Sequence, residues 1–414
     1  MRTLNIRFSF PSATQPSGQL RIFFVGETTV QRIDSLSLQR LADGNIVQTF
    51  ANIPHATTEV MAISNTAETS EIPEGDAREA VDRLFSRTRA GTASLYGTAS
   101  LASSPSLTLF LSSDATANCY LVAPGTENFR IPVARANADG TTRIGQGDSL
   151  VASVAWATNP SVVTSAESYG RGADGFLNIS TGRIEGNAVV TVSVNDGVKW
   201  SWHIWVTSYV PAGSSGNFMD RNLGALSADA NAAGTSTFGL LYQWGRKDPF
   251  PSSFDDIAKE EAPAGPNLEL SIAHPSTYYY NAKGSGDWYA SGKNTRDDRL
   301  WNDGSGKKTA YDPCPAGWRI PTSSDWDLLT ADTFLPEDGA VKGRRATRGG
   351  GWFPAAATRS YRNGVLSQSG LEGEYWNADT FGTDARILYF YSSFFLPGNT
   401  AQRASGFSVR CVKE

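Results

Sequence analysis

The fold of this chain is decided by Tyr311-Asp-Pro-Cys-Pro-Ala-Gly-Trp-Arg-Ile-Pro-Thr322, read together with Gly406-Phe-Ser-Val-Arg-Cys-Val412. The three prolines of the first stretch fix the backbone angle φ and remove three amide donors, so this stretch cannot be a regular helix or a central strand. We expect a rigid, extended lead-in that buries Trp318. It leads to Thr322-Ser-Ser-Asp325, a capping-box pattern that predicts a helix over Ser323–Leu329.

The second stretch has the pattern of a strand that closes the fold. Phe407, Val409 and Cys411 alternate with polar residues, which predicts a strand with one face on a core. We interpret Cys314 and Cys411 as a disulfide that joins this strand to the lead-in. In the chain-entropy model, closing a loop of that length stabilises the fold by about 4–5 kcal/mol.

Two further motifs complete a resemblance to a known family. They are Asp220-Arg-Asn-Leu-Gly-Ala225 and Tyr242-Gln-Trp-Gly-Arg-Lys-Asp-Pro-Phe-Pro251. Together with the two stretches above, in this order and spacing, they resemble the Fibrobacter-type major paralogous domain. The resemblance covers roughly the last half of the chain and implies a C-type-lectin-like fold. It also implies a secreted or surface protein of Bacteroidales-like bacteria, a group that includes pilus-tip adhesins. It does not specify a ligand, because lectin-like folds host many unrelated sites.

Length and composition agree with an exported protein of two or three domains. The chain has 414 residues, more than one hydrophobic core usually organises. A formal net charge of −5 argues against nucleic acid and anionic membranes as partners. No apolar run approaches the length of a membrane span. The sequence opens on a strand pattern rather than a signal peptide, so we expect an export signal to have been removed; whether a lipid anchor went with it stays open.

Residues 1–113 are predicted to form a first domain. Leu4, Ile6 and Phe8 alternate with polar residues, which predicts a half-buried strand. Asp76-Ala-Arg-Glu79 is a capping box that predicts one helix, with Ala80, Val81, Leu84 and Phe85 on its apolar face. Several strands and one helix predict a small β-sandwich. The layout, with Glu59-Val-Met-Ala-Ile-Ser-Asn65 at its centre, resembles the N-terminal domain of fimbrillins. The other predicted strands cover residues 20–25, 46–53, 59–63 and 106–111.

Residues 114–210 are predicted to form a second β-sandwich, of immunoglobulin-like or transthyretin-like type. Asn195-Asp-Gly197 lies between two alternating runs and predicts a hairpin turn. Alternation places Trp200 and Trp202 on one face of the last strand and His203 on the other, so we expect His203 on an outer or half-covered face. The predicted strands cover residues 120–122, 129–133, 149–156, 176–180, 188–194 and 200–206.

Residues 211–414 are predicted to form an α+β, C-type-lectin-like domain. The chain would therefore be mainly β, with three domains. Thr237–Trp244 is predicted to be a short helix, ended by Gly245 in the left-handed conformation. Seven of the eleven tryptophans fall in this domain, and we expect most of them in its core. The remaining predicted strands cover residues 347–353, 371–376 and 386–391.

The candidate ligand-binding residues lie in an aromatic, glycine-rich stretch between Tyr278 and Asn302, which we expect to be a long surface loop. Aromatic faces stack on sugars or on partner side chains, and neighbouring amides and carboxylates can bond hydroxyl groups. The alternative, that these rings pack the loop onto its own domain, stays open. The candidates are Tyr278, Tyr279, Tyr280, Trp288, Tyr289, Asp287 and Asn294, with Asn281 beside them.

The sequence offers little catalytic chemistry, and we expect neither an enzyme nor a cofactor. The three histidines fall in three different predicted domains, and zinc-protease, nucleophile-elbow, P-loop and dinucleotide motifs are missing. Acidic pairs such as Glu372 and Glu374 are usually only solvated. Cys119 has no local base to activate it and fits a small buried hydrophobe.

We also expect no metal site. Trp301-Asn-Asp303 spells a tripeptide of the calcium site of C-type lectins, but it precedes Cys314, and the partner loop of that site is missing. One Asn-Asp step supplies too few oxygens for calcium, which takes about six to eight. We interpret the tripeptide as a polar loop tip after a buried tryptophan.

The two resemblances together predict a role in assembly and adhesion. Fimbrillin pili, which the first domain resembles, grow by strand exchange between subunits. The sequence given stops at Lys413-Glu414, directly after the strand that holds Cys411, so we expect no free C-terminal donor strand. Such a subunit would accept a strand from a pilus shaft subunit and cap the polymer. We hypothesise a pilus-tip adhesin of an outer membrane-anchored fimbrium, which binds a host or bacterial glycan or surface protein.

Two alternatives stay open. One is a monomeric cell-surface glycan-binding lipoprotein of a carbohydrate-uptake system. The other is an enzyme related to the formylglycine-generating fold, which is also lectin-like and needs a reactive cysteine pair near a cleft. The cysteines here are better explained by a disulfide and a buried thiol, so we prefer the adhesin.

Overall fold

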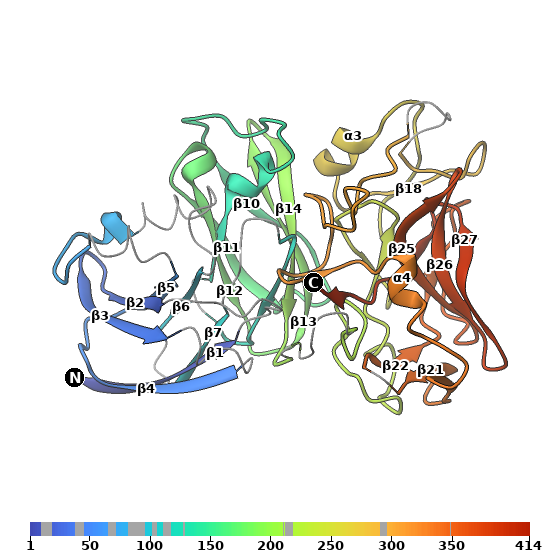
Figure 1. Ribbon diagram of the computed structural model, residues 1–414. Helices are drawn as coiled ribbons and strands as arrows, with labels where there is room; N and C mark the ends of the chain where they lie inside the picture. Colours follow the sequence, from blue (N-terminus) through green and yellow to red (C-terminus); the bar gives the residue numbers. More distant parts are fainter. Residues whose placement is uncertain are drawn as a thin grey trace. The chain divides into compact units, whose positions relative to one another are not determined.

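The computed structural model describes the whole chain except residues 10–18, 38–44, 65–71, 82–95, 102–105, 111–116, 127–128, 210, 212–217, 290–295 and 348. The described residues are mainly β and divide into two compact units (Figure 1). Unit 1 comprises residues 1–200 and 204–210, and unit 2 comprises residues 201–203 and 211–414. The predicted domain boundary at 113/114 lies outside the described residues and stays a prediction. Within the described ranges, no helix is long and apolar enough to cross a membrane.

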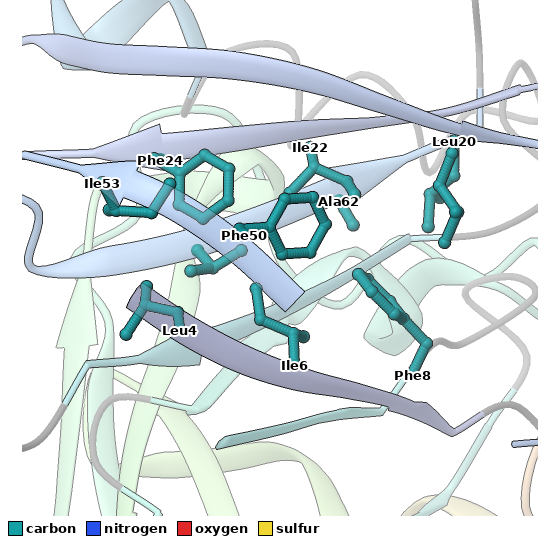
Figure 2. Close-up of a cluster of buried hydrophobic side chains, with 11 residues drawn as sticks. Leu4, Ile6, Phe8, Leu20, Ile22, Phe24, Phe50, Ile53 and Ala62 are labelled. Carbon is teal, nitrogen blue, oxygen red and sulfur yellow. The ribbon is translucent and has the colours of Figure 1, made fainter. Parts of the chain in front are cut away.

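Unit 1 begins with two sheets that share one core. One sheet has the order β4-β1-β7 and the other the order β3-β2-β5-β6. Leu4, Ile6 and Phe8 of β1 are fully buried and lie opposite Ile22 and Phe24 of β2 (Figure 2). The predicted alternation of the first strand is thereby confirmed. The strands are β1 (Arg2–Ser9), β2 (Gln19–Val25), β3 (Val30–Ser37), β4 (Asn45–Ile53), β5 (Glu59–Ile63), β6 (Tyr96–Ser100) and β7 (Ser106–Phe110).

The strand β1 occupies the centre of its sheet. It pairs antiparallel with β4, where Asn5 lies opposite Thr49, and parallel with β7, where Ile6 lies opposite Leu107. Each of its three buried apolar side chains stabilises the sandwich by about 1.5–3 kcal/mol. This first strand is therefore integral to the core of unit 1.

The predicted helix of the first domain is described only in part. Residues 78–81 are helical, and Val81 is buried against a second apolar cluster that includes Phe23 and Met61. The Asp76 side chain accepts a hydrogen bond from the Ala77 N–H at 2.8 Å. The other two residues of the predicted apolar face, Leu84 and Phe85, lie outside the described residues.

A second pair of sheets follows, with the orders β10-β13-β14-β8 and β11-β12-β9, and all of its strand residues except Ser201–His203 of β14 belong to unit 1. Asn195 and Asp196, between β13 and β14, have φ values of 50° and 63°. Positive φ at both central residues is what a type I′ hairpin requires, so the predicted hairpin is confirmed. The elements are β8 (Cys119–Val122), β9 (Phe129–Pro132), β10 (Val151–Ala157), β11 (Val163–Tyr169), β12 (Phe176–Thr181), β13 (Gly186–Val194) and β14 (Gly197–Val206), with 3-10 helices at Val133–Asn137 and Gly172–Asp174.

The expected position of His203 is wrong. His203 is only 2% exposed, and its neighbours Trp202 and Ile204 on the opposite face of β14 are fully buried. From Trp200 to Val206 the strand is buried on both faces. Alternation distinguishes two faces of a strand, but it does not reveal whether the second face is also covered.

Unit 2 is built on a sheet with the order β16-β15-β28-β25-β26-β27, to which β23 and β24 are attached. Unit 2 also contains two small two-stranded sheets, β17-β18 and β19-β29, and the three-stranded sheet β20-β21-β22, of which β21 and β22 are labelled in Figure 1. The elements are β15 (Leu240–Gln243), β16 (Phe250–Pro251), β17 (Lys259–Glu261), α3 (Leu268–Ala273), β18 (Tyr278–Tyr280), β19 (Trp318–Arg319), α4 (Ser323–Trp326), β20 (Phe334–Pro336), β21 (Gly343–Ala346), β22 (Gly351–Pro354), β23 (Thr358–Arg359), β24 (Leu366–Ser367), β25 (Gly373–Phe381), β26 (Asp384–Phe390), β27 (Phe395–Ala401), β28 (Gly406–Ser408) and β29 (Val412–Lys413).

The predicted helix over Thr237–Trp244 is wrong. The segment contains the strand β15, which pairs with β16 and β28. Gly239 has a φ of 71°, and a Cβ atom there would lie 2.6 Å from the Leu223 carbonyl oxygen. Every residue of β15 is buried. In such a segment apolar residues occur at helical spacing as well as at strand spacing, so their spacing alone does not predict a helix. Gly245 has the predicted left-handed conformation, with a φ of 82°, but it follows a strand.

The predicted disulfide and the predicted burial of Trp318 are confirmed, but the lead-in is not extended throughout, because it turns at Ala316 and Gly317, where the Trp318 N–H donates to the Pro315 carbonyl at 3.1 Å. Cys314 is bonded to Cys411 across 97 residues, and Trp318 is fully buried. The capping box of Thr322 and Asp325 is present, but the helix that it opens ends at Trp326 rather than at Leu329. All seven tryptophans of residues 211–414 are at most 1% exposed, so all of them belong to the core, where most were expected.

The closing stretch differs from the predicted one-sided strand. Pairing is interrupted after Ser408, and the carbonyls of Val409 and Cys411 accept hydrogen bonds from the N–H groups of Leu223 and Met219, each at 2.9 Å. The polar residues are buried as well, Ser408 at 1% and Arg410 at 0% exposure. The stretch therefore runs through the interior of unit 2 instead of along its surface.

Arg410 is the polar centre of this interior. Its guanidinium donates to Asn222 Oδ1 at 3.0 Å and to the carbonyls of Met219, at 3.0 Å, Trp352, at 2.7 Å, and Gly350. It also lies 3.9 Å from the centre of the Phe353 ring. A buried cation is tolerated when its donors are satisfied, as they are here. Arg410 thereby links the motif at Asp220–Ala225 to the closing stretch.

Candidate functional site

Most of the sequence-predicted binding residues lie in the interior. Tyr278, Tyr279, Asp287 and Trp288 are each at most 1% exposed. Tyr280 and Tyr289 are half-buried, and Asn294 lies outside the described residues. Over residues 278–289 the stretch is therefore not part of the exposed loop that we expected between Tyr278 and Asn302.

Hydrogen bonds hold these rings in place. The Tyr278 hydroxyl donates to the Ala404 carbonyl at 2.5 Å, and burial raises the pKa of this phenol. The Trp288 indole N–H donates to the Trp244 carbonyl at 2.7 Å. These contacts favour the alternative that the rings pack the segment onto its own domain. Ligand binding through Tyr280 and Tyr289 stays a prediction.

Asp287 belongs to a buried polar network. One carboxylate oxygen accepts the Tyr289 N–H at 2.9 Å, and the other lies 3.6 Å from Arg296 and 4.0 Å from Arg403. Burial raises the pKa of Asp287, while the Tyr289 N–H and the two guanidinium groups act in the opposite direction. The arrangement fixes the segment to Arg403 and leaves Asp287 inaccessible to a ligand.

The stretch that resembles a calcium tripeptide forms a turn. Trp301 is fully buried, and the exposed Asp303 accepts hydrogen bonds from the N–H and hydroxyl of Ser305, at 2.7 and 2.6 Å. These bonds lower the pKa of Asp303. This agrees with the interpretation of a polar loop tip after a buried tryptophan.

A different surface of unit 2 combines aromatic rings with carboxylates, and we call it the acidic aromatic face. It lies on one end of the three neighbouring strands β25, β26 and β27 (Figure 1). Glu374 of β25 lies opposite Tyr389 of β26, which lies opposite Leu396 of β27. Directly opposed residues of a sheet point to the same face, so these three side chains form one row. The face consists of Leu371, Glu372, Glu374, Tyr389, Tyr391, Phe394 and Leu396.

Side-chain contacts join the members of this face. The Tyr389 hydroxyl donates to the Glu372 carboxylate at 3.0 Å. The Tyr389 and Tyr391 rings meet edge to face, with centroids 5.4 Å apart, and Phe394 lies 5.3 Å from Tyr391. Phe394, Leu396 and Leu371 are nevertheless 44%, 46% and 54% exposed. Large apolar side chains therefore gather at the surface around two carboxylates.

The two carboxylates influence each other. Burial and, to a smaller extent, the charge of Glu372 raise the pKa of Glu374 to about 7. The pKa values of the Tyr389 and Tyr391 phenols are raised as well, the first chiefly by burial and the second chiefly by the hydrogen bond to Glu372. Near neutral pH Glu374 is therefore only partly ionised, and the phenols of this face remain hydrogen-bond donors.

The turn that carries Phe394 is fixed from its other side by Arg344. This buried guanidinium donates to the carbonyls of Tyr391 and Ser392, at 3.2 and 3.1 Å, and to the Phe334 carbonyl. The turn itself is closed by the Tyr391 N–H, which donates to the Phe394 carbonyl at 2.9 Å. The aromatic part of the face is thus held by buried hydrogen bonds.

Sequence reasoning found only parts of this face. It noted the pair Glu372 and Glu374 and predicted strands over residues 371–376 and 386–391, but it interpreted the acids as only solvated. The sequence did indicate that these side chains lie on the outer face of their strands, because Glu374 alternates with the buried Tyr375, and Tyr389 with the buried Leu388 and Phe390. The pairing of the two strands, which brings the acids beside the tyrosines, could not be read from one sequence.

No protein-family model matches the chain, and no curated protein matches its sequence. A solved structure from Bacteroides eggerthii, described as a "putative cell adhesion protein", is similar to 49% of this chain and 78% of its own, with a TM-score of 0.19 and 10% sequence identity. A TM-score this low does not establish a shared fold. The two family resemblances therefore rest on the sequence motifs.

Proposed function

We propose that this chain is a cell-surface adhesin of the pilus-tip type. In this proposal unit 1 accepts a donor strand from a pilus shaft subunit, as the resemblance to fimbrillins implies. Unit 2, which resembles a C-type-lectin-like domain, presents the acidic aromatic face to a glycan or a surface protein. The observation that carries the proposal is the position of β1 in unit 1.

The strand β1 is an early segment of the chain that lies in the middle of a sheet. It is paired on both sides, with β4 and with β7, and it buries Leu4, Ile6 and Phe8 completely. If β1 left, it would expose both pairing edges and a row of apolar pockets. Such a groove suits an incoming strand, because main-chain hydrogen bonds would supply affinity and the pockets would supply specificity.

The closing stretch of unit 2 is unsuited to be the donor. Cys411 is bonded to Cys314, and Arg410 is buried with four hydrogen-bond acceptors. Lending residues 406–413 to another subunit would require breaking the disulfide and opening the interior of unit 2. This supports a subunit that receives a strand through unit 1.

The test is a locked variant in an assembly assay. Asn5 and Thr49 lie opposite each other on β1 and β4, and their side chains are hydrogen-bonded at 2.8 Å. In the double variant Asn5→Cys/Thr49→Cys, a cross-strand disulfide should hold β1 in place. Gold-labelled protein is mixed with shaft subunits and located by electron microscopy. We expect the unlocked protein at fibre ends and the oxidised variant absent from fibres.

Two controls complete this assay. Wild-type protein treated with the same reductant as the variant corrects for any reduction of Cys314–Cys411. Reduction of the variant should restore its place at fibre ends. Wild-type label along the shaft, or equal incorporation of the oxidised variant, would show that β1 is not exchanged and that the proposal is wrong.

A further inference from the structure

The two glutamates of the acidic aromatic face lack an internal counter-ion in the described part of the chain. Other acids of unit 2 are paired, such as Asp325 with Arg319 at 2.7 Å and Glu337 with Arg345. Among the described residues, no Lys, Arg or His lies within ion-pair distance of Glu372 or Glu374. Neighbouring like charges on a sheet are destabilising, and a cation from outside would relieve this repulsion.

The surroundings of the two carboxylates are apolar and aromatic. Phe394 and Leu396 are nearly half exposed, and the rings of Tyr389 and Tyr391 lie beside Glu372. Aromatic rings attract cations, and apolar side chains can cover the methylene stem of a long basic side chain. The face thus offers both parts of a site for a Lys or Arg side chain.

We propose that the acidic aromatic face docks an exposed Lys or Arg side chain of a protein ligand, held by Glu372 and Glu374. The inference rests on the proposed adhesive function, because it names the ligand chemistry of the same unit. The negative charge of the two carboxylates favours a positively charged Lys or Arg side chain over an uncharged ligand.

The experiment uses the full chain and four nine-residue peptides displayed on streptavidin sensors. The peptides differ only at the central residue, which is Lys, Arg, norleucine or Glu. Norleucine keeps the apolar stem of lysine and removes its charge, so it isolates the cationic contribution. We expect the Lys and Arg peptides to bind at least about tenfold more tightly than the norleucine peptide at low salt. Binding should weaken as ionic strength rises.

Two double variants separate this site from general acidity. Glu372→Gln/Glu374→Gln removes both carboxylate charges and should lower binding of the Lys and Arg peptides at least about tenfold. Glu260→Gln/Glu269→Gln removes the same number of charges from exposed positions elsewhere on unit 2 and should leave binding unchanged. Thermal unfolding of both variants checks that each is folded. Equal loss in the two variants would show that only net charge matters and would overturn the inference.

The pH dependence provides a further readout. The groups facing Glu374 are Glu372 and the phenols of Tyr389 and Tyr391, which stay protonated because their pKa values are raised. Protonation of Glu374 below about pH 7 removes one of the two charges. Binding of the Lys peptide should therefore weaken as the pH falls from 8 to 5.5, and the single variant Glu374→Gln should reduce this change.

The remaining outcomes distinguish this inference from the proposed function. Equal binding of the norleucine and Lys peptides would identify a purely apolar surface and refute the cationic ligand. Glycan-array binding that is lost in Glu372→Gln/Glu374→Gln, without discrimination among the peptides, would refute it in favour of a sugar site. In both cases an adhesive function of unit 2 would stand. Failure of the fibre-end assay would instead contradict the pilus-tip function and leave the peptide result unaffected.

Discussion

Replacing Arg410 with lysine should destabilise unit 2 strongly, although the charge is kept. The Arg410 guanidinium is fully buried and donates to four oxygens, three of them carbonyls. A lysine ammonium has three donors on a single atom, so it cannot reach four oxygens that surround a planar fork. If two of the acceptors lose their donor, at about 1–2 kcal/mol each, the variant should lose about 2–4 kcal/mol of unfolding free energy.

The assay is thermal unfolding followed by tryptophan fluorescence. Unit 2 holds eight buried tryptophans, so its unfolding transition should dominate the signal. For a domain of this size, about 1 kcal/mol lowers the midpoint temperature by roughly 2–4 °C, so we expect Arg410→Lys to lower it by about 4–16 °C.

A matched control keeps this prediction specific. Arg386 is half-buried, donates to the Gly398 carbonyl at 3.2 Å, and lies over the exposed Phe381 ring. Arg386→Lys should change the midpoint by less than about 2 °C. A shift in Arg410→Lys no larger than that of the control would refute the argument that the four buried acceptors depend on the guanidinium.

Two further predictions concern covalent closure and protonation. The double variant Cys314→Ser/Cys411→Ser opens a loop of 97 residues and should lose about 4–5 kcal/mol of unfolding free energy. Urea unfolding of the variant and of the oxidised wild type measures this loss. A loss below about 1 kcal/mol would contradict the prediction. The pKa of Glu374 is raised from 4.5 to about 7 on folding, so its contribution to stability is complete below about pH 4.5 and is lost as the pH rises through 7. Glu374→Gln, which is uncharged at every pH, should therefore gain about 3 kcal/mol relative to wild type between pH 4.5 and 8, while the exposed control Glu269→Gln should show no such trend.

The strands of both units were predictable where one face alone is buried. Leu4, Ile6 and Phe8 alternate with polar residues in the sequence, and the structure buries all three. The strands β3 and β11 were missed because charged and polar residues interrupt their apolar pattern, as at Asp34 and Glu167. Tertiary pairing rather than local propensity makes these segments strands.

The error at Thr237–Trp244 has a related cause. Where a segment is buried on every side, apolar residues occur at both helical and strand spacing, and periodicity no longer distinguishes them. Partners far along the chain decided the outcome, because Leu241 and Tyr242 pair with Ser408 and Phe407. His203 illustrates the same limit, since a covered second face leaves no sign in alternation.

By itself, the sequence determined the features that depend on local covalent chemistry. These are the capping box of Thr322 and Asp325, the Asn195–Asp196 turn, and the disulfide of Cys314 with Cys411. Only the tertiary structure decided which side chains are accessible. It buried Tyr278 and Trp288, and it placed Glu374 opposite Tyr389 on a surface with Phe394. Accessibility is set by contacts between residues far apart in the chain, and a single sequence does not specify those contacts.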